Sequence, residues 1–280
     1  MFLQKGLPVM RRFIPAITTI VALLSGTAQA GAGLAPHKAV YDIKMVSRHS
    51  GAPIVDIGGQ MTYEVDKSCD AWITRHNFKL NYQYPDSPGL IINSDFSTYE
   101  SFDGKQFSFT ARRRSGEEEP EIFRGKAVII PGQAGKASFT IPKDMAIDMP
   151  VGTLFPMGHT QAVLDHINQG KKFYHAPVFD GSDDEGVIQI NSIIGKSIAG
   201  PAPYLKTAKN IDHELLKGKG WNLHMGFFPE KDDTPESDYE MKVVFHENGV
   251  ISDMLIDYHD FSVTQKLVRL EARKAEKCAP

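Results

Sequence analysis

The alternation of apolar and polar residues along this chain predicts a succession of β-strands. From His37 onward, runs rich in Val, Ile, Tyr, Phe and Thr recur every eight to fifteen positions and are separated by turn residues. This spacing favours a large antiparallel sheet or barrel, so the predicted fold class is all-β. The clearest hairpin spans residues 240–258, where Asn248 and Gly249 favour a type I′ turn. Residues 261–274 fit either a long strand or a strand that runs into a short helix.

Residues 152–170, GTLFPMGHTQAVLDHINQG, depart from the β pattern. At 100° per residue, one stripe of this segment carries Met157, Thr160, Val163, Leu164 and Ile167. Pro156 suits the first turn of a helix, and Gly170 suits its C-terminal cap. The segment therefore predicts one amphipathic α-helix, at about 157–169, inserted into the β fold.

The same helix carries two histidines and an aspartate, which raises the question of a metal or catalytic site. His159 and His166 are seven residues apart, so a helix separates them by about 10.5 Å along its axis. Ligands of one zinc ion must nearly converge, because the Zn–N distance is only about 2.0 to 2.1 Å. Asp165 and His166 are adjacent and project about 100° apart. A structural helix is favoured over a site.

The apolar side of this helix has two interpretations. Its residues either belong to the core or line an apolar groove that the helix closes. The candidate groove residues are Phe155, Met157, Val163, Leu164 and Ile167. No metal ligand set, catalytic residue or cofactor is predicted here.

The N-terminus has the three parts of a secretory signal peptide. Residues 11–12 are basic, residues 14–24 form an apolar run, and residues 28–30 form a small-x-small cleavage site. Cleavage is expected after Ala30, whether translation begins at Met1 or Met10. The apolar run is too short for a membrane span, and the protein is expected in the periplasm.

Removal of residues 1–30 leaves residues 31–280, for which we predict a single β domain. The remaining chain has 28 basic and 34 acidic residues, and hence a formal charge of −6. Nucleic-acid binding needs a concentrated basic face, which this balance does not indicate.

The chain has two cysteines, Cys69 and Cys278, both in the exported part. An oxidising compartment lets disulfides form and persist, so one intramolecular bridge is favoured. The chain-entropy model gives about 5 kcal/mol as an upper figure for a loop of this length. Two buried free thiols or an intermolecular link are the alternatives.

Motifs for nucleophilic catalysis and phosphate binding are absent from the sequence, and its ten histidines are scattered. Paired carboxylates are harder to exclude, because a glycosidase needs only two acids about 5 to 9 Å apart. Asp253 with Asp257, or Asp257 with Asp260, are candidates. The alternative function is therefore a periplasmic hydrolase of glycans or esters.

Two charged segments favour ordinary turns. Residues 112–121 place arginines and glutamates on either side of Ser115 and Gly116, which predicts an exposed hairpin. Residues 179–186 are acidic but lack the glycine of a calcium-binding loop, because Glu185 occupies that position.

Several stretches together resemble one known family. They are the signal peptide, YDIKM at 41–45, GGQMTYEV at 58–65 with Cys69 just beyond, GTLFPMGHT at 152–160, and the terminal Cys278. The chain resembles the EipB-like family of alphaproteobacterial periplasmic proteins over residues 34–280.

This resemblance implies a β-spiral, in which a curved antiparallel sheet forms a broken barrel with a helix against its inner face. Half of such a spiral is similar to envelope carriers of lipoproteins and lipids. The resemblance also implies a role in envelope integrity under envelope stress, a functional link to a TPR-repeat envelope protein, and no catalytic residues. The leading hypothesis is a non-enzymatic protein that binds a protein partner or an apolar, lipid or acyl ligand.

Overall fold

The computed structural model describes residues 33–229 and 236–278. The predicted signal peptide, residues 1–30, lies outside the described residues. The described chain forms one 14-stranded antiparallel sheet with short helices, which confirms the all-β prediction. No helix in these residues has the length and apolar character needed to cross a membrane.

The first eight strands, here called the N-terminal arm, precede the 13-residue helix Pro156–Asn168. They are β1 His37–Arg48, β2 Asp56–Lys67, β3 Ala71–Gln83, β4 Leu90–Ser101, β5 Gln106–Ser115, β6 Glu121–Val128, β7 Gly135–Ile141 and β8 Ala146–Met149. The C-terminal arm comprises β9 Phe173–Phe179, β10 Val187–Ala199, β11 Lys219–Pro229, β12 Tyr239–His246, β13 Ile251–Tyr258 and β14 Phe261–Ala272. The helices are α1 Pro156–Asn168, α2 Pro203–Lys206 and the 3-10 turn η1 His213–Leu216.

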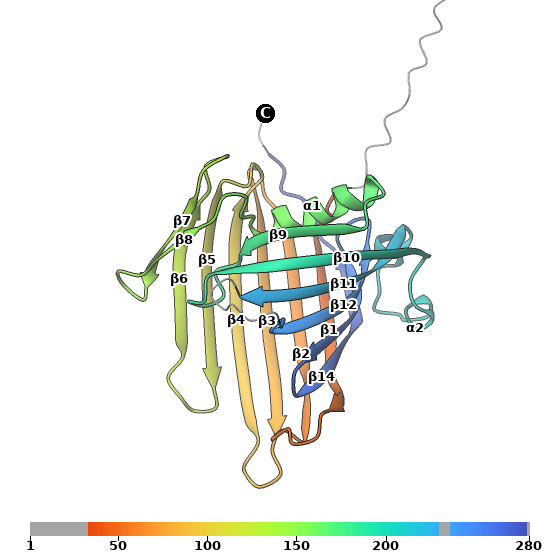
Figure 1. The fold of residues 1–280 in the computed structure, drawn as a ribbon. Helices are drawn as coiled ribbons and strands as arrows, with labels where there is room; N and C mark the ends of the chain where they lie inside the picture. The colour runs from red at the N-terminus through yellow and green to blue at the C-terminus, as the bar shows by residue number, and fades with distance from the viewer. Residues whose placement is uncertain (1–32, 230–235, 279–280) are drawn as a thin grey trace, which may run out of the picture. The chain divides into compact units, whose positions relative to one another are not determined.

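Strand order explains how the two arms form one sheet. Within each arm, every strand pairs with the next strand along the chain, and β1 pairs with β14 to join the arms. The sheet edges are β8 and β9. Figure 1 shows the long strands β3 and β4 crossing behind β10 and β11, so the sheet curls back upon itself.

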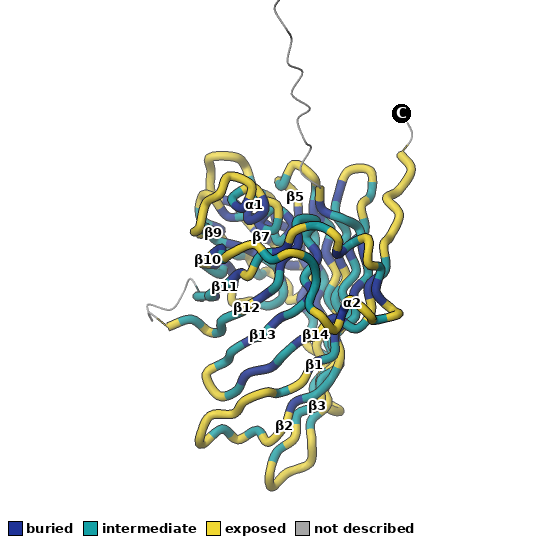
Figure 2. Tube along the Cα trace, turned by 90° about the vertical axis from the view of Figure 1, so that its right-hand side faces the viewer, coloured by how far each residue is buried: buried dark blue, intermediate teal, exposed yellow. Residues whose placement is uncertain are grey.

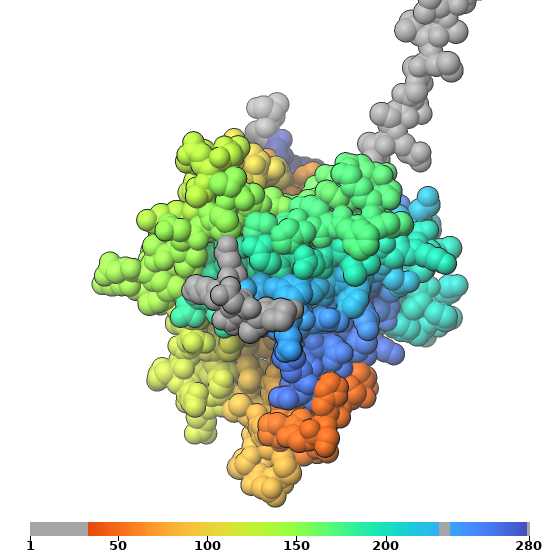
Figure 3. Space-filling model, in the orientation of Figure 1, coloured from red at the N-terminus to blue at the C-terminus, as the bar shows by residue number. Residues whose placement is uncertain are grey.

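A single backbone link nearly closes this curl. Leu154, which follows β8, forms a bridge to Val178 of β9. The Leu154 amide donates to the carbonyl of Pro177 at 2.9 Å, and the Phe179 amide donates to the carbonyl of Leu154 at 3.0 Å. In Figure 3 the surfaces of the two arms accordingly adjoin on the viewed face.

Helix α1 begins and ends where its sequence predicts. Pro156 occupies the first turn, and Gly170 beyond the C-cap has φ 69°, a conformation that glycine adopts without strain. Its buried residues are Met157, His159, Val163, Leu164 and Ile167. The predicted stripe is confirmed except at Thr160, which is half-buried. Figure 2 shows this helix in the buried colour where it meets the strands.

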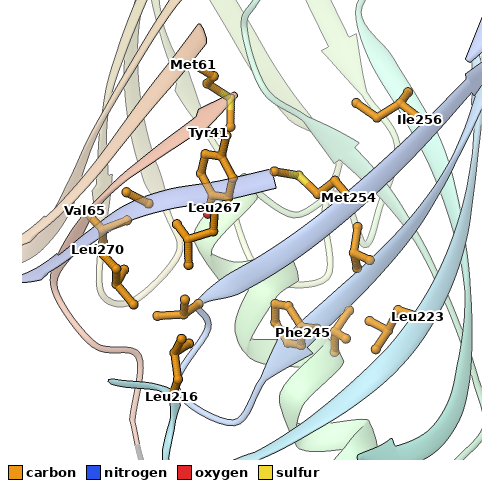
Figure 4. Packing of buried hydrophobic residues seen from close by; sticks show 14 of the residues in the cluster. Tyr41, Met61, Val65, Leu216, Leu223, Phe245, Met254, Ile256, Leu267 and Leu270 are labelled. Carbon is orange, nitrogen blue, oxygen red and sulfur yellow. The ribbon is translucent and has the colours of Figure 1, made fainter. Parts of the chain in front are cut away.

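The core consists of a large apolar cluster and a smaller aromatic one. The large cluster joins both arms and helix α1 and includes Tyr41, Val65, Leu164, Leu223 and Leu267. Figure 4 shows its side chains converging from β1, β2 and β11 to β14. The smaller cluster contains Phe107, Phe109, Phe139, Phe155 and Phe179 and packs the β9–β10 hairpin against β5 and β7.

The C-terminal segment is fastened to the end of β2. A disulfide joins Cys69 to Cys278 with Cα atoms 5.5 Å apart, which confirms the expected bridge. The Arg273 guanidinium pairs with the carboxylate of Asp66. The amide of Glu276 donates to the carbonyl of Lys67 at 3.0 Å.

The hairpin between β12 and β13 is present, but the expected type I′ turn is wrong. That turn needs positive φ at both central residues, and of the pair only Gly249 has one, at 84°. The Asn248 side chain donates to the carbonyl of Leu215 at 2.8 Å, and the Gly249 amide donates to the carbonyl of His246 at 2.9 Å. The turn is therefore not of type I′, and the contact between Asn248 and the distant Leu215 accompanies it.

Candidate ligand-binding cavity

The curled sheet encloses a cavity of about 440 Å³, here called the inner cavity. This volume lies within the range of small-molecule sites, about 300 to 1,000 Å³. From the N-terminal arm it is lined by Tyr41, Met61, Tyr63, Phe78, Phe96 and Phe123. From the C-terminal arm it is lined by Tyr239, Met241, Met254, Ile256 and Tyr258. The wall is therefore dominated by aromatic and thioether side chains.

Strand alternation and register explain why these side chains meet. Tyr41 pairs with Met61 across β1 and β2, and Met61 pairs with Phe78 across β2 and β3. Side chains at paired positions lie on the same face, so this row forms a continuous apolar strip. Figure 4 shows Tyr41 and Met61 on one side of the interior and Met254 and Ile256 on the other.

A few polar groups interrupt this apolar wall. The His76 ring packs against Tyr63 with centroids 4.4 Å apart, and burial lowers the pKa of His76 to about 4. His76 is therefore neutral at pH 7. Gln265 is 6% exposed, and its Oε1 lacks a hydrogen-bond partner among the described residues. These groups give a ligand a small number of polar contacts within an apolar site.

Glu100 is a buried carboxylate that the sequence analysis missed, and it holds helix α1 without lining the inner cavity. Its Oε2 accepts a hydrogen bond from the Met157 amide at 2.8 Å, and its Oε1 accepts one from the Gly158 amide at 2.7 Å. It is 2% exposed, and burial raises its pKa to about 7 although the two amide bonds oppose this shift. A strand carboxylate thus caps helix α1, whose own N-cap residue Phe155 provides no side-chain cap.

A sequence signal for Glu100 exists in the alternation of β4. Glu100 follows Phe96 and Thr98 at two-residue intervals, and all three share one face of the strand. An acid on an inward-facing row indicates a buried partner. The sequence does not reveal that this partner is a helix more than fifty residues away.

The five helix residues proposed for an apolar groove are all buried. Phe155 stacks on Phe107 with ring centroids 4.7 Å apart. The others, Met157, Val163, Leu164 and Ile167, lie in the large core cluster. None of the five is among the described residues that line the inner cavity. The Tyr63 hydroxyl contacts the Met157 sulfur at 3.9 Å, so the helix supports the cavity wall from outside it.

His159 and His166 both pack against Tyr174 of β9. Their ring centroids lie 5.7 and 4.2 Å from the Tyr174 ring. The Nδ1 atom of His166 lies 2.9 Å from the carbonyl oxygen of Ala162. Within the described residues, no cluster of His, Cys, Asp and Glu side chains has metal-site geometry.

The proposed carboxylate pairs lie outside the inner cavity. Asp253 and Asp257 occupy the same face of β13, four residues apart, so about 13 Å of strand separates them. This exceeds the separation that a glycosidase pair needs. Asp253 accepts a hydrogen bond from Tyr204, and Asp257 accepts one from Ser262. Asp260 follows β13 in the connection to β14.

The fold and its cavity define a β-barrel-like protein in which one curled antiparallel sheet surrounds an apolar interior. The model of the EipB-like family matches residues 28–274, and the chain belongs to this family.

Two known proteins support this assignment. The cell envelope integrity protein EipB of Brucella abortus (strain 2308) is 27% identical over 250 residues, which cover 88% of this chain and 87% of that protein. The crystal structure of a β-barrel-like protein of a domain of unknown function, DUF1849, from Brucella abortus matches with a TM-score of 0.79 and 28% identity. That match covers 87% of this chain and 100% of the solved chain.

Proposed function

We propose that this chain is a non-enzymatic periplasmic protein that supports cell-envelope integrity by holding an apolar, acyl-chain ligand in the inner cavity. The observation that carries the proposal is the cavity of about 440 Å³ walled by aromatic, methionine and isoleucine side chains. Methionine and aromatic residues form adaptable apolar surfaces that accept flexible chains.

The envelope role and location rest on three further observations. The family relative from Brucella abortus is named a cell envelope integrity protein. The disulfide between Cys69 and Cys278 suits an oxidising compartment. The N-terminal residues have the composition of a secretory signal. Together they favour export to the periplasm.

A protein partner is compatible with this function, but its support comes from the family resemblance and not from the cavity. The link to a TPR-repeat envelope protein comes from the family resemblance and stays a prediction. The cavity wall favours a small apolar ligand, because a folded partner cannot enter 440 Å³.

Filling the cavity tests the proposal. Ala111 is 7% exposed and lines the cavity on β5, so the indole of Ala111→Trp should occupy the ligand space. We expect Ala111→Trp to weaken binding of the uncharged probe Nile red by about tenfold or more, because about 1.4 kcal/mol of lost contact is already tenfold. Fluorescence titration of the purified, delipidated protein measures this.

The neighbouring position provides the matched control. Thr110 lies on the opposite face of β5, outside the inner cavity. Thr110→Trp adds the same side chain and should leave Nile red affinity within about twofold of the original, a change of only about 0.4 kcal/mol. Equal affinity in both variants, with both folded by circular dichroism, would show that the probe binds elsewhere.

A further inference from the structure

Arg113 places a positive charge on the apolar inner face of β5. Phe107, Phe109 and Ala111 precede it at two-residue intervals and are buried on that face. Arg113 continues the row and lines the inner cavity, which Arg112 at the preceding position also borders. Ser94 and Glu121 are its register partners on β4 and β6. In Figure 1 this end of β5, marked by its arrowhead, lies away from helix α1.

The charge of Arg113 is only weakly compensated. Its Nη1 lies 4.0 Å from Glu121 Oε2, beyond hydrogen-bond distance. The two side chains are 53% and 58% exposed, so this pair contributes little. Among the described residues it is the one ion pair that Arg113 makes. The guanidinium therefore keeps donors for an incoming anion.

Asp180 is the second acidic residue that lines the cavity, and it repels an anion less than a fully ionised carboxylate would. Asp180, on the turn between β9 and β10, accepts a hydrogen bond from the Ser182 amide at 2.9 Å. Burial raises the pKa of Asp180 and outweighs the hydrogen bond from the Ser182 amide, which lowers it, and the nearby Asp183 raises it further. Its negative charge is thus disfavoured where it faces the cavity.

Tyrosine hydroxyls complete the surroundings of Arg113. Tyr82 is close enough for Arg113 to lower its pKa slightly, although burial raises the pKa overall. Burial raises the pKa of Tyr258, which also lines the cavity, to about 12. Both hydroxyls stay protonated at pH 7, and that of Tyr258, which lines the cavity, can donate a hydrogen bond to an anionic oxygen.

We infer that the inner cavity takes a single-chain amphiphile with an anionic oxygen head group. The head binds Arg113, and the chain lies toward Tyr41 and Met254. This inference rests on the proposed function and adds the chemistry of the head group. A carboxylate and a phosphate monoester share that chemistry, and both match the planar donor fork of arginine.

Displacement of Nile red tests the head group. The competitors are hexadecanoate, hexadecyl phosphate, hexadecanol and hexadecyltrimethylammonium, each below its critical micelle concentration. We expect both anions to displace the probe at concentrations about tenfold lower than the alcohol, as a charge-assisted hydrogen bond implies. The tighter anion identifies the head as carboxylate or phosphate.

Three variants test whether the preference for anionic competitors depends on Arg113. Arg113→Gln should weaken both anions about tenfold and change the alcohol less than about twofold. Arg114→Gln removes the same charge from the adjacent position, which does not line the cavity, and should change every competitor less than about twofold. Glu121→Gln removes the competing carboxylate and should tighten both anions.

The outcomes separate this inference from the proposed function. If all four amphiphiles compete equally, the anionic head is wrong, and if Arg113→Gln changes none of them, its binding to Arg113 is wrong; in both cases the apolar cavity remains supported. A preference for hexadecyltrimethylammonium overturns the inference in the same way. If neither the probe nor any amphiphile binds the folded protein, both the inference and the proposed function fail.

Discussion

At the scale of single residues, Glu100 couples the strand wall to helix α1 and should make stability depend on pH. Its folded pKa of about 7 lies above the ordinary value of 4.5. A raised carboxyl pKa contributes stability that is present below about pH 4.5 and is lost as the pH rises through about 7. Each unit is about 1.4 kcal/mol, so the total is at most about 3.5 kcal/mol.

Glu100→Gln should remove this dependence, because glutamine does not titrate. The free energy of unfolding in urea, measured from about pH 5 to about pH 8, gives the comparison. The stability of the original protein relative to Glu100→Gln should fall as the pH rises. The buried histidines His76 and His159, whose pKa values are lowered to about 4, are present in both proteins and cancel. A pH-independent difference would contradict the role of Glu100.

Arg113 shows which properties of a residue the sequence predicts and which it does not. The alternation of β5 is local, so the inward position of Arg113 follows from Phe107 and Phe109 alone. The hairpin at 112–121 was predicted as an exposed turn, and it is one, yet its inward arginine also lines the cavity. The second fact depends on how the distant C-terminal arm curls over β5, which no local pattern encodes.

At the scale of elements, helix α1 is an amphipathic plug whose apolar side is core. Leu164 is 3% exposed within the large cluster, so Leu164→Asp buries an unpaired charge. We expect a loss of about 3 kcal/mol or more in the free energy of unfolding. Gln161→Asp introduces the same charge on the exposed side, where it also replaces the hydrogen bond from Gln161 to Asp165, and should cost less than about 1 kcal/mol. Equal losses in urea unfolding would show that helix propensity, not burial, governs this position.

The elements differ in how far the sequence predicts them. Helix α1 was predicted within one residue at each end, because its period and its Pro156 and Gly170 signals are local. The β12–β13 hairpin was predicted, but its turn type was not, because Asn248 donates to the distant carbonyl of Leu215. Local signals therefore establish an element more reliably than the conformation of a turn that a distant contact accompanies.

At the scale of the whole described sheet, the pairing of β1 with β14 converts two arms into one curled wall. Tyr41 pairs with Leu267 across a separation of more than two hundred residues. Sequence patterns do not reveal such a pairing, and the curved sheet was implied by the family resemblance. The cavity follows from this pairing and from the link between Leu154 and Val178. Its lining therefore comes from strands of both arms and differs from the helix groove that the sequence suggested.

The most direct test of the central claim is a calorimetric titration with saturated fatty acids from octanoate to octadecanoate. Each added CH₂ contributes about 0.8 kcal/mol, so affinity should rise about fourfold per carbon until the chain fills the inner cavity. In Ala111→Trp the rise should stop at a shorter chain. Affinity independent of chain length, or the same limit in Ala111→Trp as in the original protein, would contradict an acyl chain in this cavity.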